Sequence, residues 1–492
     1  MIARAMMGLL PATAQVTGSV ELGGTQIVGA SDAAVADLRG RYVGMVFQNP
    51  SAALNPVMTV AQQVGLPLYL HYDLSLAERS ERVTAMLAKV GLGEDVLAKY
   101  PHELSGGQRQ RVGIATALVT SPRLIIADEP TTALDSITQR QIVDLLTSLV
   151  DESGASMLFI THDFAVLNRA TTRCYVLECG RIAESGDTDA LLDQPRTDAG
   201  HRLVRSARAL SLHAGRMPGG NPCGIPRKRR WTMTDVNEGM VLRGRGLDKW
   251  YGAKHDRRQV LFGVDADVRA GECLAVIGGS GSGKTTLTRV LLGLESADGG
   301  SVEYCGEPVR GDVAHSLRLQ SGLVFQSPFD SLDPRWRIGR SIGEPLRMHH
   351  PDWPRERVAE RVTEVLEMVS LDPEMYLNRF PVDLSGGQTQ RAAIARAIVD
   401  KPKVLLADEP MSAIDVAARV RILEAFRAIR AANPSMSLVM VSHDLGVVQH
   451  IADRVAVLHD GRVEESGTTT EILKHPCSAY TRSLIEAASM QA

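Results

Sequence analysis

Short apolar runs alternate along the chain with longer segments in which apolar residues recur at helical spacing. The runs 124–127 and 404–407 are continuously apolar and end in carboxylates, and the runs 157–160 and 438–441 precede a hydroxyl residue and a histidine. Such runs are typical of buried parallel strands, whose carboxyl ends present polar side chains at one edge of a sheet. The pattern predicts an α/β fold with a ligand site at the strand ends.

The chain also repeats itself with a period of about 280 residues. Four landmarks recur in the same order: Phe-Gln, Leu-Ser-Gly-Gly-Gln, Asp-Glu-Pro and His-Asp begin at Phe47, Leu104, Asp128 and His162, and again at Phe325, Leu384, Asp408 and His443. Self-similarity of this kind indicates two copies of one domain. We expect domains at 1–212 and 240–492, joined by a solvated linker at 213–239 in which a Gly- and Pro-rich stretch precedes the basic run 227–230.

Composition narrows the class of protein. The 492 residues are 44% hydrophobic and 23% charged, and the net charge of −3 gives no reason to expect a nucleic-acid partner. The six cysteines form no CxxC pair, which argues against a disulfide scaffold or zinc module and favours a reducing cytoplasm. The apolar runs are far shorter than the ~18 residues that a membrane span needs, so any membrane role is expected to depend on a partner.

The second copy contains a phosphate-binding pattern. A predicted strand at 274–277 leads into GGSGSGKT, which matches GxxxxGK[ST], and a helical pattern begins at Thr286. Backbone amides of such a loop converge on phosphate oxygens, Lys284 should contact the β- and γ-phosphates, and the Thr285 hydroxyl should ligate Mg²⁺. The expected ATP-binding residues of this segment are Gly278, Gly279, Ser280, Gly281, Ser282, Gly283, Lys284, Thr285 and Thr286.

Phosphoryl transfer also needs groups that organise the metal and the attacking water. Asp408, at the end of an apolar run, is expected to hold the Mg²⁺ shell, and Glu409 to orient or deprotonate water. Gln326 is expected to couple metal and water to a mobile loop, and His443 to reach the γ-phosphate. The catalytic candidates are therefore Glu409, His443 and Gln326, and the metal candidates are Thr285, Gln326 and Asp408.

The pentapeptide Leu-Ser-Gly-Gly-Gln occurs twice, and with these motifs the chain resembles the ABC ATPase superfamily. The resemblance implies two P-loop NTPase domains in tandem, each with a parallel-sheet core, a helical subdomain and an antiparallel β edge. It implies that Ser105, Gly106, Gly107 and Gln108 close on ATP held by the other half, so that the halves pair within the chain. Tyr251 resembles the aromatic residue that stacks on adenine, with Trp250 as the competing choice.

The first copy departs from this pattern. Aligning 291–294 with 6–9 places Met1 opposite Thr286, so about 45 residues that include a phosphate loop have no counterpart. Two explanations stay open: translation starts upstream of Met1, or the first ATP site is inactive. As written, the sequence is expected to hydrolyse ATP at one site.

The segments after Gln48 and Gln326 resemble those of importers for oligopeptides, dipeptides and nickel, as does the ending 475–484. This resemblance implies an ATP-hydrolysing motor that is peripheral on the cytoplasmic face of the membrane. It implies that helical subdomains at about 51–97 and 329–377 dock on permease subunits, and that a solute-binding protein is an indirect partner. Peptides are the first choice of solute, and nickel or a metal chelate is the alternative. A further alternative to an importer is a soluble tandem ATPase that acts in translation. Cys223 stands alone where relatives carry a cysteine cluster, so no iron–sulfur centre is expected.

Overall fold

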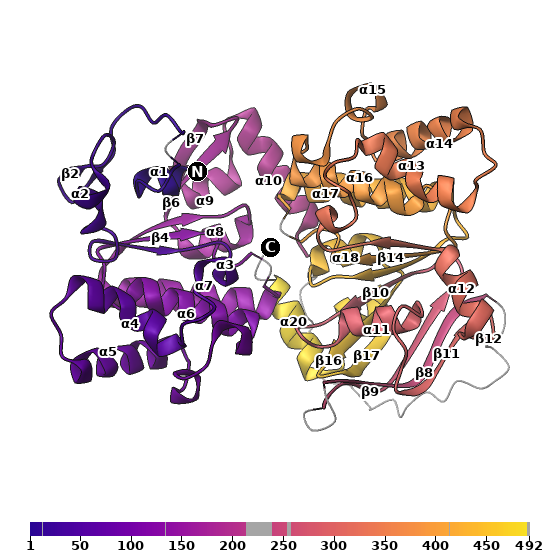
Figure 1. Ribbon diagram of the computed structural model, residues 1–492, viewed down its shortest axis with the longest axis horizontal. Coiled ribbons are helices and arrows are strands. Elements are labelled where there is room, and N and C mark those ends of the chain that lie inside the picture. Colours follow the sequence, from indigo (N-terminus) through magenta and orange to yellow (C-terminus); the bar gives the residue numbers. More distant parts are fainter. Residues whose placement is uncertain (12, 133, 213–238, 253–256, 413, 490–492) are drawn as a thin grey trace. The chain divides into compact units, whose positions relative to one another are not determined.

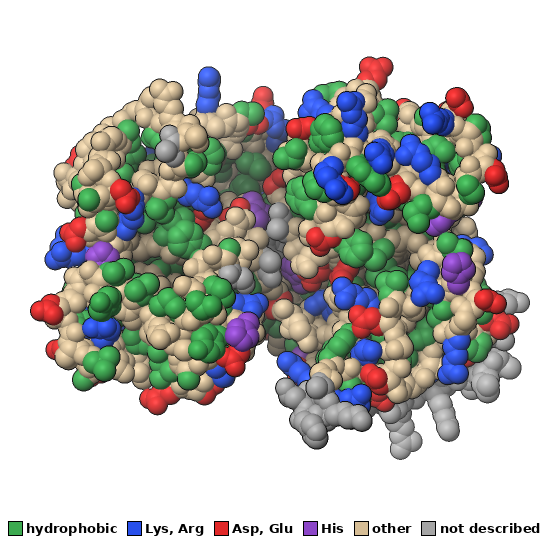
Figure 2. All heavy atoms as spheres, in the orientation of Figure 1, with side chains coloured by type: hydrophobic (Ala, Val, Ile, Leu, Met, Phe, Trp, Pro, Cys, Tyr) green, Lys and Arg blue, Asp and Glu red, His purple; other side chains and the backbone are tan. Residues whose placement is uncertain are grey.

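The computed structural model describes residues 1–11, 13–132, 134–212, 239–252, 257–412 and 414–489 (Figure 1). The chain divides into two compact units, each described by itself: unit 1 comprises Met1–Leu134 and Thr138–Gly200, and unit 2 comprises Asp135–Ile137 and His201–Ala492. The expected linker 213–239 lies outside the described residues apart from Gly239, as do the basic run 227–230 and Cys223. Acidic and basic side chains are interspersed over the visible face of both units, in keeping with the net charge of −3 (Figure 2).

Unit 2 is built on a six-stranded sheet with the order β13-β14-β15-β10-β16-β17. The first five strands pair in parallel and β17 pairs antiparallel to β16. Their bounds are Ser321–Val324 for β13, Val404–Asp408 for β14, Ser437–Val441 for β15, Cys273–Ile277 for β10, Arg454–His459 for β16 and Arg462–Thr468 for β17. Every residue of β10 and β15 is buried, which explains why these strands read as continuous apolar runs.

A second, antiparallel sheet with the order β12-β11-β8-β9 completes the core of unit 2. Its strands are β8 (Met240–Tyr251), β9 (Arg258–Arg269), β11 (Gly299–Tyr304) and β12 (Glu307–Pro308). One apolar cluster contains Leu261 of β9, Leu274 of β10 and Leu287 of the helix α11 (Lys284–Leu291), so the two sheets and this helix share a core.

Three helices of unit 2 form a separate helical layer: α13 (Ile338–His349), α14 (Arg355–Met368) and α16 (Gly386–Ile398) contact one another (Figure 1). Ile342, Val365 and Ile394 share one cluster with Leu405 of β14, so this layer packs on the sheet. The remaining helices are α12 (Gly311–Leu319), α15 (Pro373–Tyr376), α17 (Val416–Ala432), α18 (Leu445–Ile451), α19 (Thr469–Lys474) and α20 (Ala479–Ser489), with 3₁₀ turns at Pro328–Asp330 and Pro381–Asp383.

Unit 1 repeats part of this plan. Its parallel sheet has the order β3-β4-β5, and β6 and β7 form an antiparallel pair. The strands are β1 (Glu21–Leu22), β2 (Thr25–Gln26), β3 (Val43–Val46), β4 (Leu124–Asp128), β5 (Ser156–Ile160), β6 (Arg173–Glu178) and β7 (Arg181–Asp187). Order and direction of β3, β4 and β5 match those of β13, β14 and β15, as the sequence repeat predicts.

The helices of the first half of the chain also resemble those of the second half. They are α1 (Ile2–Met6), α2 (Asp32–Ala36), α3 (Pro50–Ala53), α4 (Val60–His71), α5 (Leu76–Lys89), α6 (Gly106–Leu118), α7 (Ser136–Ser153), α8 (Phe164–Ala170), α9 (Thr188–Asp193) and α10 (Asp198–Leu210), with 3₁₀ turns at Glu94–Val96 and Pro101–Glu103. Helices α4, α5 and α6 contact one another as α13, α14 and α16 do. The predicted α/β class, parallel sheets, helical subdomains and antiparallel edges are confirmed. Within the described parts of the chain, no helix is long and apolar enough to cross a bilayer.

Candidate functional site

The phosphate-loop pattern lies where strand β10 ends and helix α11 begins. Gly278 has φ +150°, and a Cβ there would lie 2.0 Å from the Leu458 carbonyl oxygen, so only glycine fits. Gly283 has φ +99° and caps the N-terminus of α11. The chain therefore turns sharply at 278–283 and places this glycine-rich loop at the N-terminus of a helix, a position that favours anions.

Lys284 lies inside this loop with a side chain that is almost fully buried. Its Nζ donates hydrogen bonds to the carbonyl oxygens of Gly278 at 2.9 Å and of Gly279 at 2.8 Å. Burial lowers the pKa of Lys284 because the charged ammonium is poorly solvated there. A bound phosphate oxygen would give this ammonium a negatively charged hydrogen-bond acceptor, where its present acceptors are neutral carbonyls.

Two oxygen groups meet beside the loop, as the sequence predicts. The Thr285 hydroxyl donates to Asp408 Oδ1 at 3.2 Å, which joins the first turn of α11 to the end of β14. Burial raises the pKa of Asp408, because its carboxylate is removed from water. A carboxylate and a hydroxyl are ligands that Mg²⁺ accepts together with water and phosphate oxygens, so these two residues fit such an ion.

Glu409 follows Asp408 in a backbone conformation that is uncommon for residues other than glycine, with φ +44°. Gln326 Nε2 donates to its Oε2 at 2.9 Å, and His443 Nδ1 lies 3.5 Å from its Oε1. Burial alone would raise the pKa of Glu409, but hydrogen bonding and charge from His443 outweigh it, so the pKa lies below its usual value. All three catalytic candidates therefore lie together, and the carboxylate is ionised and fixed from two sides.

Unit 1 contains the same arrangement around Glu129, which has φ +48°. Gln48 Nε2 donates to Glu129 Oε2 at 2.7 Å, and His162 Nδ1 lies 3.2 Å from Oε1. The hydrogen bond from His162 is the main cause that lowers the pKa of Glu129. The positive φ of the glutamate and its two side-chain partners therefore recur in both copies of the domain.

The Leu-Ser-Gly-Gly-Gln segments each begin a helix of 13 residues, α6 and α16. Ser105 Oγ accepts from the Gln108 amide at 3.2 Å, and Gln108 Oε1 accepts from the Ser105 amide at 2.9 Å. This capping box uses the amides of Ser105 and Gln108 and neither the Gly106 nor the Gly107 amide in the first turn of the helix. Their engagement with nucleotide held by the other half stays a prediction.

The two aromatic candidates for adenine stacking both lie at the end of β8. Tyr251 is 41% exposed and its hydroxyl donates to Glu295, while Trp250 is 38% exposed. Lys249 Nζ lies 5.4 Å from the centre of the Tyr251 ring. Both rings have a free surface for stacking, so the choice of Tyr251 stays a prediction.

The sequence matches the family model described as ABC transporter over residues 1–132 and 261–412, which is more than half of the chain. The chain belongs to the ABC transporter family. Each matched stretch contains three of the four repeated motifs, those that begin at Phe47, Leu104 and Asp128 and at Phe325, Leu384 and Asp408, so the two halves are each of this type.

Relatives agree with this assignment along nearly the whole ABC chain. The peptidoglycan transport ATP-binding protein YejF of Agrobacterium fabrum is 37% identical over 97% of this chain and 86% of its own. The oligopeptide transport ATP-binding protein OppD of Mycobacterium bovis is 35% identical over 99% of this chain and 90% of its own. The glutathione import ATP-binding protein GsiA of Escherichia coli K12 is 36% identical over 92% of this chain and 75% of its own. The chain is an ABC-type ATPase.

Among solved structures, the dimer of a bacterial ABC transporter cassette, MJ0796, is 28% identical and covers 46% of this chain and 99% of its own, with a TM-score of 0.43.

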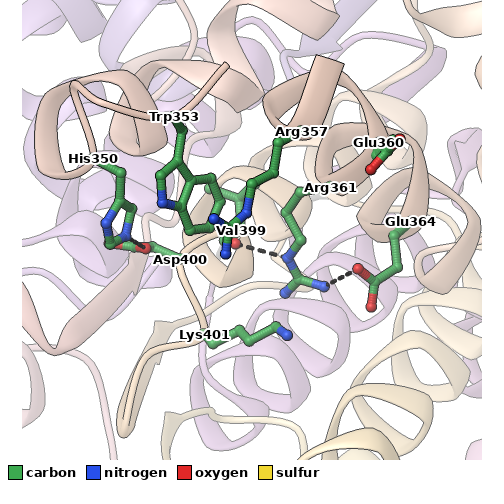
Figure 3. Close-up of a pocket in the computed structure, with 9 residues that line it drawn as sticks. All are labelled: His350, Trp353, Arg357, Glu360, Arg361, Glu364, Val399, Asp400 and Lys401. Atoms are coloured by element: carbon green, nitrogen blue, oxygen red, sulfur yellow. Dashed lines mark hydrogen bonds and ion pairs between the residues drawn. The ribbon is translucent and has the colours of Figure 1, made fainter. Parts of the chain in front are cut away.

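A cavity of 470 Å³ in the helical layer of this ABC ATPase is lined by residues of the segment before α14, of α14 itself and of the segment after α16 (Figure 3). Trp353 lies between α13 and α14, its ring stacks on His350 at 4.4 Å, and the Arg357 guanidinium lies 3.8 Å from the ring centre. Asp400 Oδ1 lies 2.7 Å from His350 Nε2, within hydrogen-bonding distance. The lining contains none of the residues predicted for ATP binding, so we assign it no part in ATP chemistry.

Tyr480, which no motif indicates, also contacts the phosphate loop. The Tyr480 hydroxyl accepts a hydrogen bond from the Gly279 amide at 2.7 Å. The segment 475–484 was noted only for its resemblance to importers, and local pattern contains no sign of a contact between residues 201 positions apart.

The environment of Glu409 predicts a change in pH dependence. Replacing His443 by Ala removes the two largest contributions that lower the pKa of Glu409 and leaves the burial that raises it. Because a general base must be ionised, the acidic limb of kcat against pH is expected to move to higher pH. His315→Ala, at an exposed histidine of the same unit, is the control. A limb that stays in place in His443→Ala would contradict this account of Glu409.

Proposed function

We propose that this ABC chain is the ATP-hydrolysing motor of an importer for peptides, acting through partner permeases. The observation that carries the proposal is the meeting of Thr285, Asp408, Glu409, Gln326 and His443 around one phosphate loop. The solute class is supported by the names of the relatives, since peptidoglycan, oligopeptides and glutathione all contain amide-linked amino acids.

Each side chain then has a task in hydrolysis. Lys284 Nζ has three donors, so it can bind phosphate oxygens while it keeps its hydrogen bond to the Gly278 carbonyl, and amides at the start of α11 bind the remaining oxygens. Thr285 and Asp408 would hold Mg²⁺, which when bound would neutralise phosphate charge. Glu409 orients the attacking water and accepts its proton, because its carboxylate is ionised and held by Gln326 and His443.

The two halves, with proposed boundaries 1–212 and 240–492, pair within the chain in this proposal. The amides at the N-terminus of α6, with Ser105 and Gln108, complete the ATP site of the second half, since a helix N-terminus attracts phosphate. ATP then binds the closed pair of halves more tightly than the open pair, and this difference in binding free energy drives the movement of the permeases. The chain would work as a peripheral protein on the cytoplasmic face of the membrane, with a solute-binding protein as an indirect partner.

Uptake and co-purification test the proposal together. Cells that lack the chain are expected to lose uptake of a labelled tripeptide. Uptake is expected to return with the wild-type chain and not with Glu409→Gln. The chain is also expected to co-purify with permease subunits from membranes. Co-purification with ribosomes and unchanged tripeptide uptake would contradict the importer and favour the translation alternative.

A further inference from the structure

Helix α20 brings a tyrosine to the phosphate loop. The Tyr480 hydroxyl lies 2.7 Å from the Gly279 amide nitrogen, which donates to it. The Tyr480 ring stacks on His459 of β16, with ring centres 3.8 Å apart and planes at 21°. It also packs against the cluster that contains Ala275 and Ile277 of β10. Since the ring is held on several sides, the position of its hydroxyl is fixed.

The segment before α20 is fixed as well. Glu465 of β17 accepts hydrogen bonds from the amides of Cys477 at 2.9 Å and Ser478 at 3.1 Å. This carboxylate clamp holds the start of α20 on the sheet. Burial raises the pKa of Tyr480, so its hydroxyl keeps its proton at neutral pH.

The amide that Tyr480 binds belongs to the same planar peptide unit as the Gly278 carbonyl. In a trans peptide the N–H and C=O groups point in opposite directions, so fixing one fixes the other. The Gly278 carbonyl accepts from Lys284 Nζ at 2.9 Å. One peptide unit therefore joins the tyrosine to the lysine, in a glycine segment that could otherwise rotate easily.

We propose that Tyr480 is a positioning residue of the ATP site: its hydroxyl orients the peptide unit between Gly278 and Gly279 and thereby sets the position of the Lys284 ammonium. The proposal rests on the ATP-binding role proposed above for this loop.

The lack of space for a side chain at Gly279 supports this assignment. Its φ lies outside the left-handed region, so the backbone itself does not demand glycine. A Cβ at this position would lie 3.0 Å from the Tyr480 hydroxyl oxygen, which is closer than a side-chain carbon normally comes. The tyrosine thus explains why the loop has glycine here.

The first half of the chain provides an internal comparison. Glu184 accepts from the amides of Arg196 at 2.7 Å and Thr197 at 3.1 Å, which is the same carboxylate clamp as at Glu465. Counting from the clamp, the position of Tyr480 corresponds to Ala199, in the first turn of α10. The clamp therefore forms without the tyrosine, and the hydroxyl is an addition in the half that contains the phosphate loop.

The first test is Tyr480→Phe in the full-length chain, which removes the hydroxyl and keeps the ring. Because one hydrogen bond is lost, the KM for ATP is expected to rise about 3- to 10-fold. The kcat is expected to change less than about twofold. Tyr304→Phe is the matched control, because this buried tyrosine of unit 2 donates to Gln320 at 3.0 Å, away from the loop. An unchanged KM in Tyr480→Phe, with only a lower unfolding midpoint, would overturn the proposal.

A double-mutant cycle gives a readout that a purely structural role would not move. Gly279→Ala alone is expected to raise the KM for ATP about 10-fold, because the new methyl group meets the hydroxyl oxygen. In the Tyr480→Phe background that contact is gone, so Gly279→Ala is expected to add less than about twofold. Additive effects of the two substitutions would overturn the proposal.

Lys284→Ala separates this proposal from the proposed role of the loop. If Lys284→Ala leaves ATP binding unchanged, the loop's role itself is wrong. If Lys284→Ala abolishes binding and Tyr480→Phe has no effect on KM, the loop's role stands and only the tyrosine's role is wrong.

Discussion

Replacing Glu409 by Gln is expected to lower steady-state ATP turnover by about 10²- to 10⁴-fold, the usual contribution of a general base. Glutamine keeps the size of the side chain but cannot accept a proton from water. Gln326 and His443 contact the side chain from two directions, at 2.9 and 3.5 Å, so the substituted amide should stay in place. The Kd for ATP is therefore expected to change less than about threefold.

Turnover and equilibrium ATP binding measured on the same preparation check this prediction. Glu356→Gln is the control, because it makes the same change of charge on an exposed residue of α14. Turnover in Glu409→Gln within threefold of wild type would show that Glu409 is not the base.

Replacing Lys284 by Ala is expected to raise the Kd for ATP by about 100-fold or more. A hydrogen bond to a charged group contributes about 1.5–3 kcal/mol, and the ammonium is positioned to bind more than one phosphate oxygen. The two carbonyls that now accept from Lys284 Nζ belong to the loop itself, so the substitution should leave the sheet and its core intact. The unfolding midpoint is accordingly expected to change little.

Titration of ATP into the variant, with thermal unfolding alongside, tests this. Lys403→Ala removes an exposed lysine of the same unit and serves as the control. Wild-type affinity in Lys284→Ala would contradict the placement of ATP at residues 278–285.

Much of the fold could be predicted from local pattern, for a physical reason. Strands β10, β14 and β15 are buried on both faces, so they appear in sequence as uninterrupted apolar runs, and the phosphate loop follows β10 directly. Asp408 and Glu409 could be placed at the sheet edge because they follow one such run.

Details of the site depend on contacts between distant segments, which local pattern does not contain. Gln326 donates to Glu409, 83 residues away, a contact that local pattern does not contain, and its place at the metal stays a prediction. The left-handed backbone of Glu409 is likewise set by its surroundings, since its amide donates to the Val441 carbonyl of the neighbouring strand at 3.0 Å. Tyr480 was missed because it reaches Gly279 from the far end of the domain.

A single-turnover experiment tests most directly whether this phosphate loop and Glu409 form an ATPase site. ATP is bound to the full-length chain without Mg²⁺, Mg²⁺ is added, and bound ATP and phosphate are followed with time. The wild-type chain is expected to convert its bound ATP to ADP and phosphate, whereas Glu409→Gln is expected to retain it as ATP. Equal conversion by the two chains would contradict the account.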